Sequence, residues 1–485
     1  MSHTLVSAAP AQERKTAGWV AFVACGALVF DGYDLTVYGT IMPTLLNDPS
    51  QLGALDPSTA GLLGSYAMLG VLVGALTCGA VGDWLGRRRL LLVSISWFSL
   101  GMLFTAFATS VMAFGILRFL SGLGLGAVLA VAGATMAEFA PANKRNLYNA
   151  IVYSGVPAGG VLAAGLGIIL LEPLGWRGLF IIGAAPLVLV PIAFFKVPES
   201  PRWLLTRGRR EEAIATARRA GTPLVDDSQL VTDSASVERT GFAALLTPRW
   251  RMATIFLGFL SFAGLLLTYG LNTWLPEIMQ GYGYDTSGSL AFLLILNGGA
   301  VIGALIGSTI ADRFSPRPII VSTFILAAIT LTLMTFQLPI AFLFAFIAMA
   351  GVGTLGTQVL GYGYVSTYYT TNARSAGVAW FAGFGRIGGV IGPFIGGFIA
   401  SIGLGGAQAF YVFAGVALFG ALMAYLVPKQ PDLESAGTTQ VGTDQTRTDQ
   451  AATAPAPAPA ATAVAPADRP ALATDDAGAA SHPQS

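Results

Sequence analysis

The sequence is poor in charged residues, in cysteine and in histidine. Asp, Glu, Lys and Arg make up 11% of its 485 residues, whereas a soluble domain carries about 25%. The two cysteines, Cys25 and Cys78, lie in apolar runs without the spacing of a disulfide framework or a metal site. The formal net charge of +1 indicates no basic surface for nucleic acid. These shortages exclude an ordinary soluble domain and predict a protein that lies in a lipid bilayer.

Long apolar runs fill most of the chain, and 54% of all residues are hydrophobic. A helix that crosses a bilayer needs about 20 mostly apolar residues, and twelve runs meet this requirement. Their approximate limits are 18–43, 58–82, 89–108, 111–136, 147–171, 178–196, 252–275, 287–311, 317–336, 339–365, 375–401 and 407–427. The sequence therefore predicts an all-α integral membrane protein with twelve transmembrane helices.

One long connection, residues 197–251, divides the twelve runs into six and six. It contains the stretch RGRREEAIATARR, which is typical of a soluble helix. We therefore expect an N-terminal tail at 1–17, a six-helix bundle at 18–196 and a second bundle at 252–427. The remaining residues, 428–485, are rich in Ala, Pro and Thr and lack the apolar bulk to fold, so a disordered tail is predicted.

The distribution of Lys and Arg predicts how the chain is oriented. With the N-terminus inside, 23 of the 26 basic residues lie on the cytoplasmic side, Arg118 and Arg386 fall within spans, and Arg177 lies outside. Cytoplasmic loops of membrane proteins carry an excess of Lys and Arg. We therefore expect a multi-pass membrane protein with both termini in the cytoplasm.

The two halves resemble each other at a shift of 229–230 residues. GAVGDWLGRRR at 79–89 matches STIADRFSPRP at 308–318, and SGLGLG at 121–126 matches AGVGTL at 350–355. A parallel repeat of this kind predicts two six-helix bundles related by an axis along the membrane normal. The binding site is then expected between the bundles, near the membrane midplane.

Three motifs resemble those of the major facilitator superfamily: GDWLGRRR after the second span, RFLSGLGLG in the fourth and PESPRWL after the sixth. The DGYD of the first span, combined with PESPRWL, resembles the aromatic acid:proton symporter family. The resemblance implies a transporter rather than an enzyme. It would import benzoate or a hydroxybenzoate together with a proton, use the proton gradient without a cofactor, and function as a monomer.

Two carboxylates, Asp31 and Asp34, lie inside the first span. Each costs about 2.5–3.5 kcal/mol to place near a bilayer centre. Residues three apart share a helix face, so both are expected to face a central cavity, where two like charges do not ionise together easily. The histidines, His3 and His482, lie in the terminal tails. A carboxylate is therefore the expected proton carrier.

The arginines inside the spans are expected to meet these carboxylates. A rise of 1.5 Å per residue places Asp34 and Arg118 about 13 and 10 Å below the outer face, which predicts an ion pair. The same rise places Arg386 about 16 Å deep, near Asp31, where its guanidinium suits a bidentate carboxylate. We predict that Asp31, Asp34 and Arg118 couple the proton and that Arg386 binds the substrate anion. The alternative is that these charges only neutralise one another to hold the helices together.

A second charged group is expected at the cytoplasmic surface, as an inner gate. Its members are Gly82, Asp83, Gly86, Arg87, Arg88, Glu138 and Arg374. The glycines permit close approach of helix ends, and Asp83 is expected at the first turn of the eleventh span. We predict that contacts within this group close the inner side while the outer side is open. The alternative is that the basic loops only set the topology.

Aromatic residues on the spans are candidates for stacking on a flat anion beside a guanidinium. We predict that Tyr33, Trp380 and Phe384 bind the substrate together with Arg386. Further candidates are Tyr38, Tyr66, Tyr153, Tyr269, Trp274, Tyr362 and Phe381. The polar residues Asn272, Asn297 and Gln358 either bind ring hydroxyls or bridge helices.

Three other functions stay open at this point. PESPRWL also resembles sugar-porter sequences, so a proton symporter for a sugar or another organic anion is one alternative. Proton-coupled drug exporters share the loop signature, although an arginine in the eleventh span suits an anion better than a cationic drug. A transporter-like chemoreceptor without net flux is the alternative outside transport.

Overall fold

The computed structural model describes residues 3–7, 9–141, 144–226, 242–311, 316–336 and 338–428. Within this part of the chain, eleven helices are long and apolar enough to cross a membrane, and the apolar segment Ala185–Lys196 is a shorter one. The prediction of an all-helical, multi-pass membrane protein is confirmed. The predicted tail lies outside the described residues apart from Pro428.

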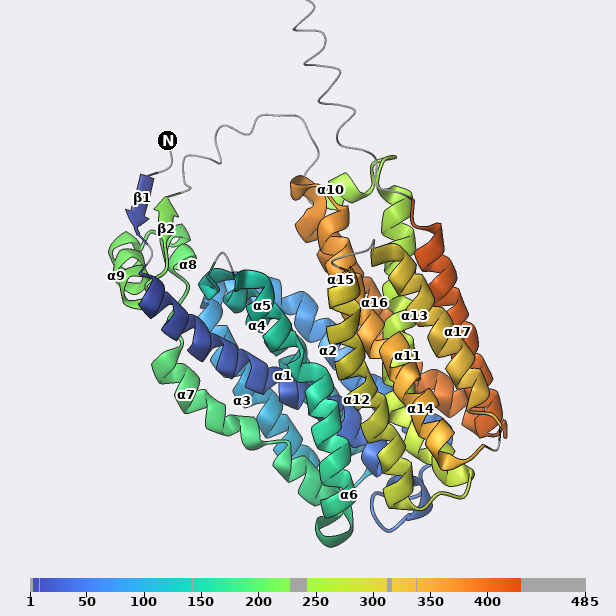
Figure 1. Ribbon diagram of the computed structural model, residues 1–485. Coiled ribbons are helices and arrows are strands. Elements are labelled where there is room, and N and C mark those ends of the chain that lie inside the picture. Colours follow the sequence, from blue (N-terminus) through green and yellow to red (C-terminus); the bar gives the residue numbers. More distant parts are fainter. Residues whose placement is uncertain are drawn as a thin grey trace, which may run out of the picture. The chain divides into compact units, whose positions relative to one another are not determined.

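The helices of the first bundle correspond to the first six predicted spans (Figure 1). They are α1 (Pro10–Asn47), α2 (Pro57–Leu85), α3 (Arg87–Thr105), α4 (Val111–Phe139), α5 (Arg145–Tyr153), α6 (Gly155–Ile182) and α7 (Leu189–Lys196). The fifth and sixth spans join without a long loop, because Gly175 turns the chain within α6 at φ 65°, a conformation that favours glycine. The sixth span is broken by the 3-10 helix Ala185–Val188, which has Pro186 at its start.

The second bundle contains the remaining spans (Figure 1). They are α11 (Arg251–Gly281), α12 (Thr286–Ala311), α13 (Pro316–Leu333), α14 (Ile340–Gly351), α15 (Thr357–Tyr368), α16 (Thr371–Ser401) and α17 (Gly406–Leu426). The tenth predicted span consists of α14 and α15, joined by the π-helix Val352–Gly356.

The connection between the bundles contains three short helices, α8 (Pro201–Thr206), α9 (Arg210–Ala220) and α10 (Phe242–Leu245). The helix predicted in RGRREEAIATARR is α9. It has acidic residues in its first turn, basic residues in its last turn and a left-handed Gly221 after its end, all of which stabilise a short helix. The sequence missed two strands, β1 (His3–Val6) and β2 (Leu224–Asp226), which pair antiparallel and tie the N-terminal segment to this connection.

Close glycine contacts repeat between the two bundles. A Cβ added at Gly122 on α4 would lie 2.3 Å from the carbonyl oxygen of Ala67 on α2. A Cβ at Gly351, which follows Gly122 by 229 residues, would lie 2.0 Å from the carbonyl oxygen of Leu296, which follows Ala67 by the same shift. Small residues of this kind let membrane helices approach closely. The structure thus reproduces in three dimensions the repeat found in the sequence.

Among the described residues, the most extensive contacts between the bundles are those of α1 with α11, α2 with α16 and α6 with α12. Ser65 near the start of α2 donates to the carbonyl oxygen of Val390 at 2.7 Å, and Gly61 packs against the backbone of Gly397. Because α1 begins at one end of the bundle and α2 begins at the other, these contacts lie at the end opposite to the start of α1. This arrangement brings α1, α11 and α16 together around the charged residues.

Candidate functional site

A buried salt bridge joins two helices of the first bundle. The guanidinium of Arg118 on α4 donates to Oδ1 of Asp34 on α1, and the two side chains are only 2% and 1% exposed. The guanidinium also lies 5.1 Å from the ring centroid of Tyr38 and 5.9 Å from that of Phe180. The ion pair that the sequence predicts is therefore present, and aromatic rings shield it from solvent.

This salt bridge leaves hydrogen-bonding capacity unused. Oδ2 of Asp34 and Nε of Arg118 are buried and have no hydrogen-bond partner among the described residues. A buried ion pair is most stable when its remaining donors and acceptors are satisfied. An incompletely satisfied pair can change partners at lower cost, which suits a group that gains and loses a proton.

Asp31 lies one helical turn before Asp34, on the same side of α1, and connects the salt bridge to the second bundle. Its charge interacts with that of Asp34 and with that of Arg386 on α16. Asp31 and Arg386 are 8% and 7% exposed, so both retain some accessible surface, in contrast to the sealed pair of Asp34 and Arg118. The structure therefore brings the four predicted charges into one chain of interactions across the bundle interface.

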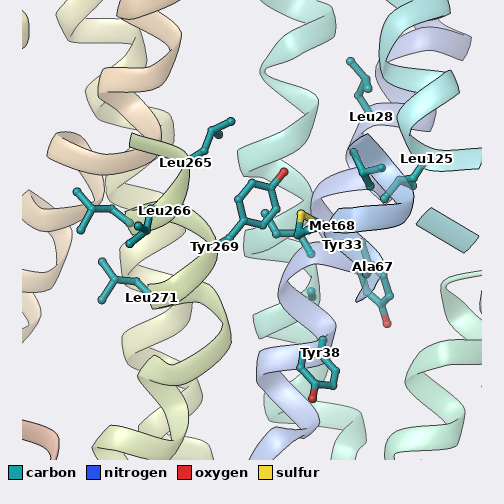
Figure 2. Close-up of a cluster of buried hydrophobic side chains, with 14 of the residues drawn as sticks. Leu28, Tyr33, Tyr38, Ala67, Met68, Leu125, Leu265, Leu266, Tyr269 and Leu271 are labelled. Carbon is teal, nitrogen blue, oxygen red and sulfur yellow. The ribbon is translucent and has the colours of Figure 1, made fainter. Parts of the chain in front are cut away.

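Arg386 also interacts with three tyrosine hydroxyls, those of Tyr153, Tyr269 and Tyr362. These tyrosines come from three different helices, α5, α11 and α15. Figure 2 shows Tyr269 extending from α11, the helix that packs against α1 with its Tyr33 and Tyr38. The guanidinium thus lies within electrostatic range of three phenol groups.

Gln358 on α15 adds an amide to this group. Its Nε2 donates to the hydroxyl of Ser261 on α11 at 2.8 Å, and its side chain lies beside the Tyr362 hydroxyl. An amide and a phenol together offer both donors and acceptors. The arrangement around Arg386 can therefore bind a flat anion that also carries polar ring substituents.

Tyr153 gives this site some accessible surface. Tyr153 ends α5, and its side chain is 39% exposed although Arg386 lies close enough to interact with its hydroxyl. Since α5 begins at the end of the bundle where α1 starts, Tyr153 lies about 12 Å from that end.

The opposite end is closed by polar contacts between the bundles. Asn272 on α11 accepts hydrogen bonds from Thr36 on α1 at 3.2 Å and from Asn297 on α12 at 2.9 Å, and all three are at most 2% exposed. A Cβ added at Gly39 would lie 1.9 Å from the carbonyl oxygen of Asn272. The two asparagines therefore bridge helices, which is one of the two roles considered from the sequence.

The predicted aromatic partners of Arg386 lie elsewhere. Tyr33 is completely buried and donates to the carbonyl oxygen of Leu179 at 2.8 Å, within the first bundle. Trp380 donates to the carbonyl oxygen of Thr254 at 2.8 Å and stacks on Phe384, whose ring lies 5.1 Å from that of Phe259.

Helix geometry separates Phe384 from the site as well. Residues two apart do not face the same side of a helix, so Phe384 points away from Arg386. Tyr33, Trp380 and Phe384 thus contact other residues, whereas Tyr153, Tyr269 and Tyr362 lie within electrostatic range of Arg386. Substrate binding by Tyr33, Trp380 and Phe384 stays a prediction.

The residues of the predicted inner gate are found mainly in contacts within the first bundle. Arg87 interacts electrostatically with Glu138, which accepts a hydrogen bond from the hydroxyl of Ser200. Gly86, at φ 89°, leaves space for Glu199, whose Oε1 accepts the backbone N–H of Arg88 at 3.0 Å. The sequence analysis quoted Glu199 within PESPRWL without assigning it this role.

Three further gate residues complete this account. Gly82 is buried at the end of α2, where Nη1 of Arg87 would lie 3.0 Å from an added Cβ. Arg374 is exposed in the first turn of α16. The side chain of Asp83 lies outside the part of the chain that the structure describes, so its predicted contact with α16 stays a prediction.

The site contains carboxylates, phenols and two guanidinium groups. In the described part of the chain, no group of three or more His, Cys, Asp or Glu side chains could hold a metal ion.

Comparisons with known proteins agree with the geometry. A family model described as "Sugar (and other) transporter" matches residues 19–430. The chain is 33% identical over 413 residues to the benzoate transport protein of Acinetobacter baylyi, an alignment that covers 82% of this chain and 87% of the relative. It is 34% identical over 400 residues to the gentisate transporter of Corynebacterium glutamicum, covering 81% and 84%.

A solved structure of a D-xylose–proton symporter has the same fold, with a TM-score of 0.67, 19% identity and coverage of 85% of this chain and 98% of that one. At this identity the likeness concerns the fold alone. Both the family match and the relatives describe transporters and not enzymes. The chain belongs to the sugar (and other) transporter family of the major facilitator superfamily, and within it the chain is similar to transporters of aromatic acids.

Proposed function

We propose that this protein is a proton-coupled symporter that imports an aromatic carboxylate of the benzoate or hydroxybenzoate class by alternating access. It acts in the bacterial plasma membrane as a monomer with both termini in the cytoplasm. The observation that carries the proposal is the chain of charges from Arg118 through Asp34 and Asp31 to Arg386, which crosses the interface between the bundles.

The substrate binds at Arg386. Its planar guanidinium donates two parallel hydrogen bonds to a carboxylate, and the rings of Tyr153, Tyr269 and Tyr362 stack on or surround the aromatic part. The Gln358 amide beside Tyr362 is placed to bind a ring hydroxyl. Relatives that transport benzoate, gentisate and gallate support a substrate that combines one carboxylate with an aromatic ring.

The proton binds at Asp31 or Asp34. Without a proton, Asp31 competes with the substrate carboxylate for Arg386, since both are anions. Protonation of Asp31 removes this competitor and frees the guanidinium for the substrate. Protonation of Asp34 likewise weakens its salt bridge with Arg118. Proton binding in the first bundle is thereby linked to substrate binding at Arg386 in the second.

Alternating access follows from the two ends of the site. The bundles meet through Thr36, Asn272 and Asn297 at one end, while Tyr153 gives accessible surface at the other. With the N-terminus in the cytoplasm, this is an inward-open arrangement. The exposed Arg374 agrees with an open inner gate, and rocking of the bundles would break the outer contacts and bring α16 to the ends of α2 and α4.

Uptake into proteoliposomes tests the proposal. Purified protein is reconstituted with a pH gradient that is acidic outside, and uptake of labelled benzoate is competed with 4-hydroxybenzoate, gentisate, xylose and a cationic dye. We expect gradient-dependent uptake that the aromatic acids inhibit and the sugar and the dye do not. Inhibition by xylose alone would favour a sugar symporter, and binding without gradient-dependent uptake would favour a receptor.

A further inference from the structure

A basic cavity of about 460 Å³ lies where α1, α3, α7, α8 and α9 meet, at the end of the first bundle where α1 begins. None of the four charges of the transport site lines it. The basic side chains that line it are Lys15, Arg88, Arg89, Lys196, Arg209 and Arg219. Two carboxylates, Glu199 and Glu212, also belong to the lining, so six positive and two negative charges leave a formal excess of four positive charges.

Both carboxylates are already engaged by the protein. Oε1 of Glu199 accepts the backbone N–H groups of Arg88 and Ser200, each at 3.0 Å. Glu212 forms an ion pair with Arg209, with Nε to Oε1 at 2.8 Å. Among the described residues, neither carboxylate forms an ion pair with Lys15, Arg89 or Arg219. The excess positive charge of the cavity is therefore available to an anion from outside the chain.

Arg88 carries a guanidinium whose hydrogen bonds are incompletely satisfied. One of its terminal nitrogens donates to the carbonyl oxygen of Phe194, and its guanidinium carbon lies 4.9 Å from the centroid of the Phe194 ring. Its Nε is buried and has no hydrogen-bond partner among the described residues. An anion in the cavity would therefore stabilise the Arg88 guanidinium through its charge rather than through a hydrogen bond to the buried Nε.

The cavity lies at the boundary of the apolar spans. Arg88 and Arg89 occupy the first turn of α3, and Lys196 is the last residue of α7. Lys196 lies 5.4 Å from the ring centroid of Trp19, and the neighbouring Phe195 is 78% exposed. Basic residues and aromatic rings at the ends of membrane helices are typical of the level of the lipid headgroups.

We propose that this cavity binds the phosphodiester headgroup of an anionic membrane lipid. The guanidinium groups of Arg88 and Arg89 contact the phosphate from α3, while Lys15 and Arg219 contact it from α1 and α9. The acyl chains leave the cavity along the exposed rings of Phe194 and Phe195. Because α9 belongs to the connection between the bundles, the bound lipid fastens this connection to the first bundle.

The test uses the full-length protein in detergent and two double variants. Lys15→Gln with Arg219→Gln removes two charges from the lining. Arg14→Gln with Arg218→Gln removes the same charge from the adjacent positions of the same two helices, which do not line the cavity. Each protein is titrated with phosphatidylglycerol, phosphatidylcholine and inorganic phosphate, and its thermal unfolding midpoint is followed by tryptophan fluorescence.

We expect phosphatidylglycerol to raise the midpoint of the wild type and of the control variant, and phosphatidylcholine to have little effect. The Lys15→Gln/Arg219→Gln variant should need about thirtyfold more phosphatidylglycerol to reach the same rise in midpoint. This is the loss of affinity expected when two basic contacts with an anionic lipid are removed. Equal responses of the two variants, or an equal effect of phosphatidylcholine, would overturn the proposal. Saturation by inorganic phosphate, with no further effect of the lipid, would show that the site binds soluble phosphate and would overturn the assignment to lipid.

A second measurement separates binding from folding. Native mass spectrometry of the same samples should show phosphatidylglycerol retained on the wild type and on the Arg14→Gln/Arg218→Gln control. The lining variant should show the intact protein without it. Retention of the lipid by all three proteins would contradict the proposal even if the lining variant were less stable. Neither measurement depends on transport.

Discussion

Asp34 pairs with Arg118 inside the first bundle, while Asp31, one turn away on the same helix, interacts with Arg386 of the second bundle. A change of charge on α1 therefore acts on both arginines. The positions that correspond to Asp34 and Arg118 after a shift of 229 residues are Ala263 and Ile347, which are fully buried and apolar. Asp34 and Arg118 thus lie where the repeat is broken.

Removal of one partner of the buried salt bridge should be more harmful than removal of both. Arg118→Leu leaves the Asp34 carboxylate buried and unpaired, which costs about 3–5 kcal/mol of stability. The double variant Asp34→Asn/Arg118→Leu should recover most of this loss in a thermal unfolding assay. Proton-driven uptake should stay absent in both. Full uptake by the double variant would show that the pair is only structural.

Arg386→Lys keeps the charge and removes the planar guanidinium. A single ammonium cannot donate two parallel hydrogen bonds, so we expect KM for benzoate uptake to rise about tenfold, the effect of about 1.4 kcal/mol. Arg14→Lys, on the exposed start of α1, is the matched control and should leave KM unchanged. An unchanged KM in Arg386→Lys would place the carboxylate at another residue.

We expect closure of the end at which Thr36 and Asn272 meet to depend on the absence of a side chain at Gly39. A Cβ there would lie 1.9 Å from the carbonyl oxygen of Asn272, and backbone atoms on both sides cannot move aside. Gly39→Ala should therefore hold the bundles apart at this end, with loss of uptake but retention of benzoate binding. Gly18→Ala on the same helix, where no atom lies within 4 Å of the added Cβ, should transport normally.

Chemical labelling of a buried residue can test directly whether Gly39→Ala holds the bundles apart. In a background without Cys25 and Cys78, a cysteine is introduced at Thr36, whose side chain is fully buried in the closed arrangement. We expect a maleimide added from outside to react slowly with this cysteine in the Gly18→Ala control and rapidly in Gly39→Ala. Equally slow labelling in both would contradict the role of Gly39 in closure.

Asp56 caps α2 in a way that depends on pH. Its carboxylate accepts the backbone N–H of Thr59 at 3.1 Å and the Thr59 hydroxyl at 2.6 Å, and these hydrogen bonds lower the pKa of Asp56. The cap therefore contributes above the unfolded-state pKa of about 3.9 and is lost as the pH falls through the lowered folded-state value.

We expect Asp56→Ala to destabilise the protein by about 1 kcal/mol at pH 7. The difference from the wild type should shrink below about pH 4, as the wild-type cap is protonated. Asp56→Asn keeps a capping oxygen and should stay near the wild type at neutral pH. Thermal unfolding of the three proteins at several pH values measures this, and a difference that does not change with pH would rule out the carboxylate cap.

Much of the fold could be predicted from the sequence, because length and hydropathy define membrane spans and the repeat appears as matched glycine motifs. The pairing of Asp34 with Arg118 could also be predicted, since helix rise fixes depth along each span. The depth of a residue in the membrane does not determine, however, which way its side chain points around the helix axis. α16 is apolar or small on most sides, so the pattern does not tell which face carries Arg386 and which carries Trp380 and Phe384.

Other parts of the site depend on the arrangement of the bundles rather than on any one helix. Thr36, Asn272 and Asn297 form hydrogen bonds only because α1, α11 and α12 meet at the closed end. The sequence shows these residues as polar positions in apolar helices without indicating their partners. Tyr153 approaches Arg386 across the bundle interface, and local sequence contains no signal for such a contact.

Proton movement driven by the substrate tests the central claim most directly. Proteoliposomes that contain a pH-sensitive dye receive an inward benzoate gradient without an imposed pH gradient, and internal acidification is recorded for the wild type and Asp31→Asn. We predict rapid acidification with the wild type. With Asp31→Asn we predict none, although labelled benzoate still exchanges across the membrane. Wild-type acidification that persists in Asp31→Asn, or benzoate entry without any acidification by the wild type, would contradict the proposed coupling.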